Sequence, residues 1–399
     1  MKIVYCTDSV YRMGGIELVT IAKANALAAI PSNQVWIALA DNSHSAITRL
    51  SKVSVLDLAV HYYENDGKGF WLDMMDFWKK RRFHRHRLEQ MLNDINPDVV
   101  ISTGLSTRYF LTELRIQSNP VFIREMHFTR SYRQHHARGF RKSFFAQISE
   151  MRDYGFAIKK FDKIVVLTEA DKTGSWKNWN KVTVMPNPLI KQAKEHSVGT
   201  NKVAITASRW VWAKNYDSLI HIWAKVVQRH PDWVLQIWGE GPEENHMREL
   251  VDKMGLMNHV FLMGSTHNVQ EQMAKASLFV LTSRTEGFSL VAIEAMSVGI
   301  PAVVYNCPGG IRYVVKDGET GFLVPMDDED AFAEKVCTLI ENENLRRTMG
   351  QAALKEVEQY GIEKITQRWM DLFQELLDKK RGKETMQLFD DENAIVLSR

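Results

Sequence analysis

Short apolar runs rich in β-branched residues recur along the whole chain, with longer helical stretches between them. Runs of four to six such residues suit strands buried on both faces of a sheet, and their alternation with helices indicates parallel sheets with crossover helices. The pattern therefore predicts an α/β fold. The runs are residues 2–6, 35–39, 98–102, 121–124, 163–168, 182–185, 203–207, 234–238, 260–263, 278–281, 302–304 and 322–324.

The runs fall into two halves of similar length, separated near Pro186-Asn187-Pro188. Each half suits one Rossmann-like, doubly wound domain, and ligands of such sheets bind beyond the carboxyl ends of the strands. We therefore expect two domains facing a central cleft. The expected division is residues 1–190, a first Rossmann-like domain; 191–201, a linker; 202–360, a second Rossmann-like domain; 361–380, a helix packing back on the first domain; and 381–399, a polar tail.

Composition restricts the class of protein. With 45% hydrophobic and 25% charged residues, the 399-residue chain is an ordinary globular protein, neither disordered nor collagen-like. The three distant cysteines favour a reducing compartment and give no zinc spacing. We find no secretory signal and no apolar stretch of membrane-spanning length, so we expect a cytoplasmic protein.

One segment of the second half carries a candidate site. A strand ends near Ser283, a loop holds Glu286 and Gly287, and a helix begins near Ser289 with Glu294 in its second turn. The helix start offers free N–H groups and a positive dipole end, which suit an anion or a hydroxyl. Two carboxylates beside such a site favour a polyol ligand. Taken alone, the two acids could equally be solvated residues of a helix start.

The motifs around that segment resemble those of retaining family 4 glycosyltransferases of the GT-B fold, including bacterial capsule, exopolysaccharide and lipopolysaccharide enzymes. The resemblance covers about residues 202–340 in order and spacing. It rests on the stretch from Glu286 to Pro301, on Arg209 with Lys214 and Asn215, on Gly239-Glu-Gly-Pro, on Pro308-Gly-Gly, and on Asp317-Gly-Glu-Thr-Gly.

The resemblance implies a role for each matching residue. Glu294 would hold the donor ribose, and Glu286 would lie at the donor sugar as a catalytic residue. Arg209 and Lys214 would neutralise the donor diphosphate. Backbone groups of Gly239 and of the loop residues would contact the donor; the loop residues are Gly287, Phe288, Ser289 and Leu290. No cofactor and no metal are expected. A nicotinamide cofactor is unsupported because Glu244 replaces the third glycine of the dinucleotide motif.

The first half adds three candidate residues. Gly14 and Gly15, at a strand-to-helix turn, allow close backbone approach to a ligand, and by resemblance they lie near the donor phosphates. His127, just after a strand, matches by resemblance the family's active-site histidine, near the reacting carbon, with Arg124 and Glu125 as weaker candidates. The resemblance makes residues 1–190 the acceptor-side domain and residues 202–360 the nucleotide-sugar-binding domain.

The first half is also basic: residues 1–190 hold 27 Lys and Arg against 18 Asp and Glu. Segments 79–87 and 130–142 mix cations with aromatic residues, which favours an anionic membrane surface and a peripheral location on the plasma membrane over nucleic acid. Solvated helix faces are the alternative.

The predicted function is transfer of a hexose or N-acetylhexosamine from a nucleotide sugar, with UDP the expected nucleotide, to a lipid-linked or polysaccharide-precursor hydroxyl. Retention is implied by the resemblance. The alternatives are a nucleotide-sugar epimerase or phosphorylase on the same fold, a nucleotide-sugar-binding protein without turnover, and, with less support, a glycosidase.

Overall fold

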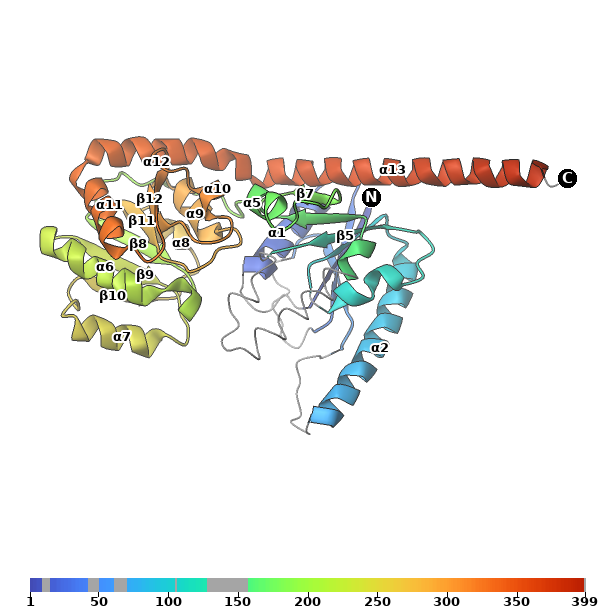
Figure 1. Ribbon diagram of the computed structural model, residues 1–399, viewed down its shortest axis with the longest axis horizontal. Helices are drawn as coiled ribbons and strands as arrows, with labels where there is room; N and C mark the ends of the chain where they lie inside the picture. The colour runs from blue at the N-terminus through green and yellow to red at the C-terminus, as the bar shows by residue number, and fades with distance from the viewer. Residues whose placement is uncertain (9–14, 42–49, 61–69, 105, 128–156, 398–399) are drawn as a thin grey trace. The chain divides into compact units, whose positions relative to one another are not determined.

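The computed structural model describes residues 1–8, 15–41, 50–60, 70–104, 106–127 and 157–397, and these form two compact units (Figure 1). Unit 1 comprises Met1–Val166, Trp176–Pro188 and Ile362–Arg399. Unit 2 comprises Leu167–Ser175 and Leu189–Gly361. In the described part of the chain, no helix is long and apolar enough to cross a membrane.

Unit 1 is built on a parallel sheet. Its seven described strands lie in the order β3-β2-β1-β4-β5-β6-β7, so the winding reverses between β1 and β4. Ligands of such sheets bind at this reversal, beyond the carboxyl ends of the strands. The strands are β1 (Lys2–Thr7), β2 (Gln34–Leu39), β3 (Val53–Asp57), β4 (Val99–Ser102), β5 (Val121–Glu125), β6 (Lys163–Val166) and β7 (Val182–Val184).

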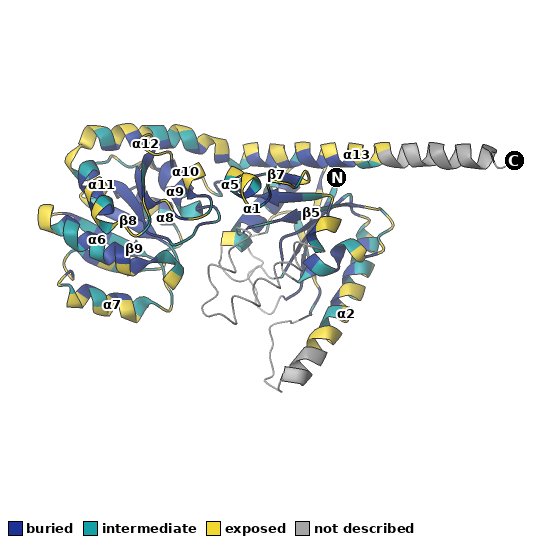
Figure 2. Cartoon of the chain, in the orientation of Figure 1, coloured by how far each residue is buried: buried dark blue, intermediate teal, exposed yellow. Residues whose placement is uncertain are grey.

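Helices cover both faces of this sheet. Alternate side chains of β1 point to opposite faces, so Tyr5 packs with α1 (Gly15–Ala28) and α13 (Ile362–Leu397), whereas Cys6 packs with α2 (Phe70–Ile95). The inner strands are buried between these layers (Figure 2). The last long helix of the chain therefore supplies part of the core of the first unit.

Unit 2 repeats the same winding. Its six described strands lie in the order β10-β9-β8-β11-β12-β13, so the winding reverses between β8 and β11. The strands are β8 (Val203–Ala207), β9 (Val234–Trp238), β10 (Val260–Gly264), β11 (Leu278–Leu281), β12 (Ala302–Tyr305) and β13 (Gly321–Val324). The helices are α5 (Glu169–Thr173), α6 (Tyr216–Arg229), α7 (Glu244–Lys253), α8 (Val269–Met273), α9 (Leu290–Ser297), α10 (Ile311–Val314), α11 (Glu329–Glu341) and α12 (Glu343–Val357).

The two units divide the chain differently from the sequence-based expectation. Segment 167–175, expected in the first domain, belongs to unit 2. The expected linker, 191–201, is bonded into unit 2: the Arg346 guanidinium donates to the carbonyl of Gly199 at 2.8–2.9 Å. The expected polar tail continues α13 as far as Leu397. Gly14 and segment 130–142 lie outside the described residues.

Candidate functional site

The loop between β11 and α9 carries the central acid of the predicted site. It begins where the winding of unit 2 reverses, and it is fixed to the segment after β12. The Glu286 N–H donates to the Pro308 carbonyl at 3.2 Å, and the Gly310 N–H donates to the Glu286 carbonyl at 2.7 Å. A Cβ on Gly310 would lie 2.4 Å from the Gly287 oxygen, so this approach requires glycine.

The Glu286 carboxylate is held by two donors. Its Oε1 atom accepts from Lys214 Nζ at 2.7 Å and from Ser283 Oγ at 2.6 Å. The Glu286 side chain is only 9% exposed, while that of Lys214 is 21% exposed. The ion pair and the hydroxyl hydrogen bond offset the cost of burying the Glu286 carboxylate. The pair therefore places a fixed negative group beside a cation that solvent can reach.

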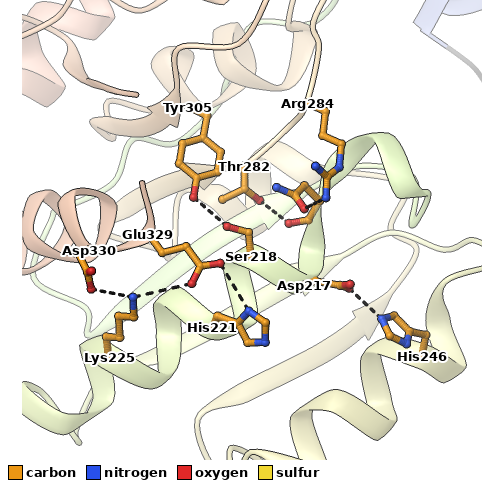
Figure 3. Close-up of polar contacts among 11 residues, drawn as sticks. Asp217, Ser218, His221, Lys225, His246, Thr282, Arg284, Tyr305, Glu329 and Asp330 are labelled. Atoms are coloured by element: carbon orange, nitrogen blue, oxygen red, sulfur yellow. Dashed lines mark hydrogen bonds and ion pairs between the residues drawn. The ribbon is translucent and has the colours of Figure 1, made fainter. Parts of the chain in front are cut away.

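Lys214 owes its position to the segment after β8. It ends a short 3₁₀ helix, Trp212–Lys214, and Asn215 follows in the left-handed conformation with φ 54°. Thr282 and Arg284, from the end of β11, reach this segment (Figure 3). The Thr282 hydroxyl lies 3.0 Å from the Asn215 carbonyl oxygen, and Arg284 donates to Asn215 Oδ1 at 2.5 Å. The strands on either side of the winding reversal are thus joined at their carboxyl ends.

Arg209 and Gly239 lie on the neighbouring loops. Arg209 is exposed, and its side chain has no hydrogen bond or ion pair within the described part of the chain. Gly239 has φ +138°, and a Cβ there would lie 1.9 Å from the Ser208 carbonyl oxygen. In this structure the role of Gly239 is thus close packing of the β9 loop against the segment that carries Arg209.

The start of α9 presents polar groups that lack partners. Ser289 is the N-cap residue, and its buried Oγ has no hydrogen-bond partner among the described residues. Phe288 packs edge-on against Tyr360, with ring centroids 5.5 Å apart, and this contact fixes the loop before the helix. Free N–H groups at a helix start bind anions. Leu290 is the first residue of this helix.

Glu294 is partly buried on the second turn of α9, and its carboxylate makes no hydrogen bond or ion pair in the described regions. Burial raises the pKa of Glu294 to about 7. A carboxylate that lacks a partner in such surroundings is stabilised by hydroxyl donors from a ligand.

The predicted residues of the first half belong to unit 1. Gly15 is exposed at the start of α1. His127 is buried just beyond β5, and burial is the main cause that lowers its pKa to about 4. Its ring is neutral in the pH range of most enzymes.

Sequence reasoning missed Ser283, Thr282 and Arg284, which position the Lys214–Glu286 pair. The one available signal was that these three residues directly follow the strand that precedes Glu286. Their partners lie 67–69 positions away along the chain or within the loop itself, and no local pattern reveals the longer contacts.

Residues 190–356 match the family model of glycosyl transferases group 1. The chain is 34% identical over 226 residues to an exopolysaccharide phosphotransferase of Streptomyces coelicolor, and the aligned region covers 55% of this chain and 24% of that protein. It is 33% identical over 217 residues to an uncharacterized glycosyltransferase of Haemophilus influenzae, which covers 53% of this chain and 61% of that protein. The chain thus spans less than two thirds of the length of either relative.

The solved structure of Anabaena HepE in complex with UDP has a similar fold. Its TM-score is 0.73 at 18% identity, and the superposition covers 94% of this chain and 100% of that chain. Together with the two parallel α/β units, this likeness confirms the predicted GT-B fold.

Proposed function

We propose that this chain is a glycosyltransferase that moves a sugar from a nucleotide-sugar donor to a hydroxyl acceptor. The observation that carries the proposal is the Lys214–Glu286 pair, held at the winding reversal of unit 2 beside the start of α9. The match of residues 190–356 to glycosyl transferases group 1 supports the same reaction class.

The donor would be held through its charge and its hydroxyls. The diphosphate of a nucleotide sugar carries two negative charges, and the accessible Lys214, the exposed Arg209 and the N–H groups at Ser289 offer positive potential for it. Glu294 would accept hydrogen bonds from the ribose hydroxyls. UDP is the proposed nucleotide because the similar HepE structure holds UDP.

We propose retention of the anomeric configuration and no metal requirement. In a front-face substitution, the leaving diphosphate takes the proton of the acceptor hydroxyl. The protein must then stabilise the leaving group and position both substrates. Lys214 and Arg209 would supply that stabilisation. The proposed acceptor is a polysaccharide-precursor or lipid-linked sugar in surface glycan synthesis, and the similarity to an exopolysaccharide phosphotransferase supports this class.

The first test measures nucleotide release from UDP-, GDP- and ADP-sugars, with and without a lipid-extract acceptor and in EDTA. Acceptor-stimulated release of a nucleoside diphosphate from one donor is the expected result. Release of the monophosphate would indicate transfer of a sugar phosphate instead. Epimerisation or phosphorolysis without an acceptor would identify the other enzymes of this fold. Tight binding without release would mean a binding protein.

A second test separates the site from the fold. Glu286→Gln is expected to lower transfer by ~10²-fold or more while thermal unfolding changes little, since the amide keeps the volume of the carboxylate. Glu249→Gln, at an exposed position of α7, is the matched control and should leave transfer unchanged. Wild-type transfer by Glu286→Gln would contradict the proposed site.

The proposed peripheral membrane contact rests on one face of α2. Trp78, Lys79, Arg82, Phe83 and His86 are exposed there, and we call them the basic–aromatic face. Trp78 is 57% and Phe83 48% exposed. The five residues recur at spacings of three and four along the helix, opposite its buried side, and none of them is acidic. Cations together with aromatic rings match the interface of an anionic bilayer.

Vesicle co-sedimentation tests this contact. The protein should bind vesicles that contain phosphatidylglycerol and not pure phosphatidylcholine, and K79E/R82E should abolish the preference. The control K253E/K275E reverses two exposed cations of unit 2 and should retain it. Equal binding to both vesicle types, or equal loss in both variants, would refute the contact.

A further inference from the structure

A fully buried lysine lies in the core of unit 1. Lys23, on α1, is 2% exposed and forms an ion pair with Glu125 at the end of β5. Its ammonium also lies 4.9 Å from the ring centroid of Trp369, on α13, and 5.9 Å from that of Tyr5, on β1. An ion pair this deep loses the solvation of two charges, and apolar residues of equal volume generally serve stability as well or better. Stability alone is therefore a weak reason for this pair.

The pair lies directly against a candidate catalytic residue. The Oε1 atom of Glu125 that receives Lys23 is also 3.5 Å from Nε2 of His127. That approach does not have the geometry of a hydrogen bond, and Nε2 has no partner among the described residues. Glu125 thus stands between a cation and an imidazole, and the cation holds it.

The charges around His127 compete. Burial is the largest influence and lowers the pKa of His127; Glu125 raises it, and Lys23 lowers it. Arg124, also buried on β5, lowers it further and is itself bonded to Ser102. Tyr5 from β1 faces Glu125, and burial raises the pKa of its hydroxyl.

We propose that Lys23 is a positioning residue. By holding the Glu125 carboxylate, it opposes the transfer of a proton onto His127 and thus adds to the effect of burial, which favours the neutral imidazole. The consequence for catalysis rests on the proposed function. Glycosyl transfer builds positive charge at the anomeric carbon. If His127 acts at that carbon, as the family resemblance implies, an imidazolium would oppose the charge, whereas a neutral ring would not.

The decisive measurement is the titration of His127 itself. Protein labelled with ¹³C at histidine Cε1 is followed by NMR from pH 3 to 8.5, a range that includes the wild-type midpoint near 4, and the His127 signal is assigned from its loss in His127→Gln. In Lys23→Met, the titration midpoint should rise by about 1 to 3 pH units, because Glu125 loses its hydrogen-bonded cation and its charge then favours protonation of the adjacent His127. In K23M/E125Q, which removes both charges at similar volume, the midpoint should return to the wild-type range.

The matched control is Lys160→Met. Lys160 pairs with Glu113 at 2.6 Å on the surface of the same unit. The variant therefore removes an exposed lysine ion pair and should leave the titration midpoint of His127 unchanged. Thermal melts of all four proteins establish that they are folded. If Lys23→Met fails to fold, Lys23→Gln and the double variant carry the comparison.

The titration and the transfer assay test different claims, so one claim can be refuted while the other stands. An unchanged His127 midpoint in a folded Lys23→Met, or an equal rise in the double variant, overturns the role of Lys23 whatever the protein catalyses. If the midpoint rises as expected, the pH at which transfer activity is half lost on the acidic side should rise by the same amount. In K23M/E125Q it should return to the wild-type value. If the His127 midpoint rises but the pH dependence of transfer does not change, Lys23 controls the charge of His127 as proposed, but His127 takes no part in the reaction.

Discussion

Replacing Glu294 by glutamine tests whether the Glu294 carboxylate lacks a hydrogen-bond partner in the free protein and gains one when a ligand binds. The raised pKa of Glu294 means that ionising this carboxyl opposes folding. The sign follows from proton binding: between the usual value of 4.5 and about 7, the native state holds the proton more tightly than the unfolded chain. The free energy of unfolding therefore falls as pH rises through that window.

The size of the effect follows from the two pKa values. A difference from 4.5 to about 7 corresponds to roughly 3 kcal/mol once both states are ionised. Partial exposure of the side chain reduces this to about 2 kcal/mol. Glu294→Gln carries no titrating group, so between pH 5 and pH 8.5 the wild-type protein should lose about 2 kcal/mol of unfolding free energy relative to this variant.

Urea unfolding of both proteins at the two pH values measures this difference, and the other titrating groups cancel. Saturating UDP should stabilise the wild-type protein more at pH 8.5 than at pH 5, and should stabilise Glu294→Gln less than wild type. Parallel pH dependences of wild type and variant, without UDP, would refute the claim that the carboxylate is buried without a partner.

Three further outcomes follow from the described contacts. Gly239→Ala should lower the free energy of unfolding by about 2–4 kcal/mol, because its Cβ would meet the Ser208 oxygen, while Gly255→Ala, with nothing within 4 Å, should lose only about 1 kcal/mol; equal losses in urea unfolding would contradict the packing argument. Lys214→Met should slow acceptor-stimulated nucleotide release by ~10²-fold or more, because Glu286 and the leaving diphosphate lose the same cation, and wild-type rates would exclude that role. Phe373→Ala should cost about 3–5 kcal/mol in thermal unfolding, since the ring is completely buried in unit 1; a loss below 1 kcal/mol would mean that α13 contributes little to this core.

Continuous apolar runs were sufficient to locate the inner strands of both sheets, because a strand covered on both faces needs apolar side chains at nearly every position. The edge strand β3 escaped prediction for the opposite reason. In Val53–Asp57 the polar residues Ser54 and Asp57 are exposed and interrupt the apolar ones, so the strand contains no apolar run of four to six residues. The helical end of α13 was missed because its polar composition reads equally well as a loose tail.

The candidate site shows a similar division. The position of Glu286 follows from a local pattern of strand, glycine loop and helix. The buried Lys23 does not, because a lysine on a helix is generally exposed. Its partner Glu125 lies 102 positions away, and only the packing of α1 and α13 against one face of the sheet brings the two together.

The membership of α13 in unit 1 has a consequence for biosynthesis. The ribosome delivers β1 and α1 first, but Trp369 and Phe373, which close their side of the core, are added only after all of unit 2 has been translated. Unit 2 can thus complete its fold earlier than the unit that precedes it, reversing the usual order of nascent domains. A transcript interrupted before Ile362 would yield a finished second half joined to a first half with an uncovered apolar face, a natural substrate for chaperones and proteases.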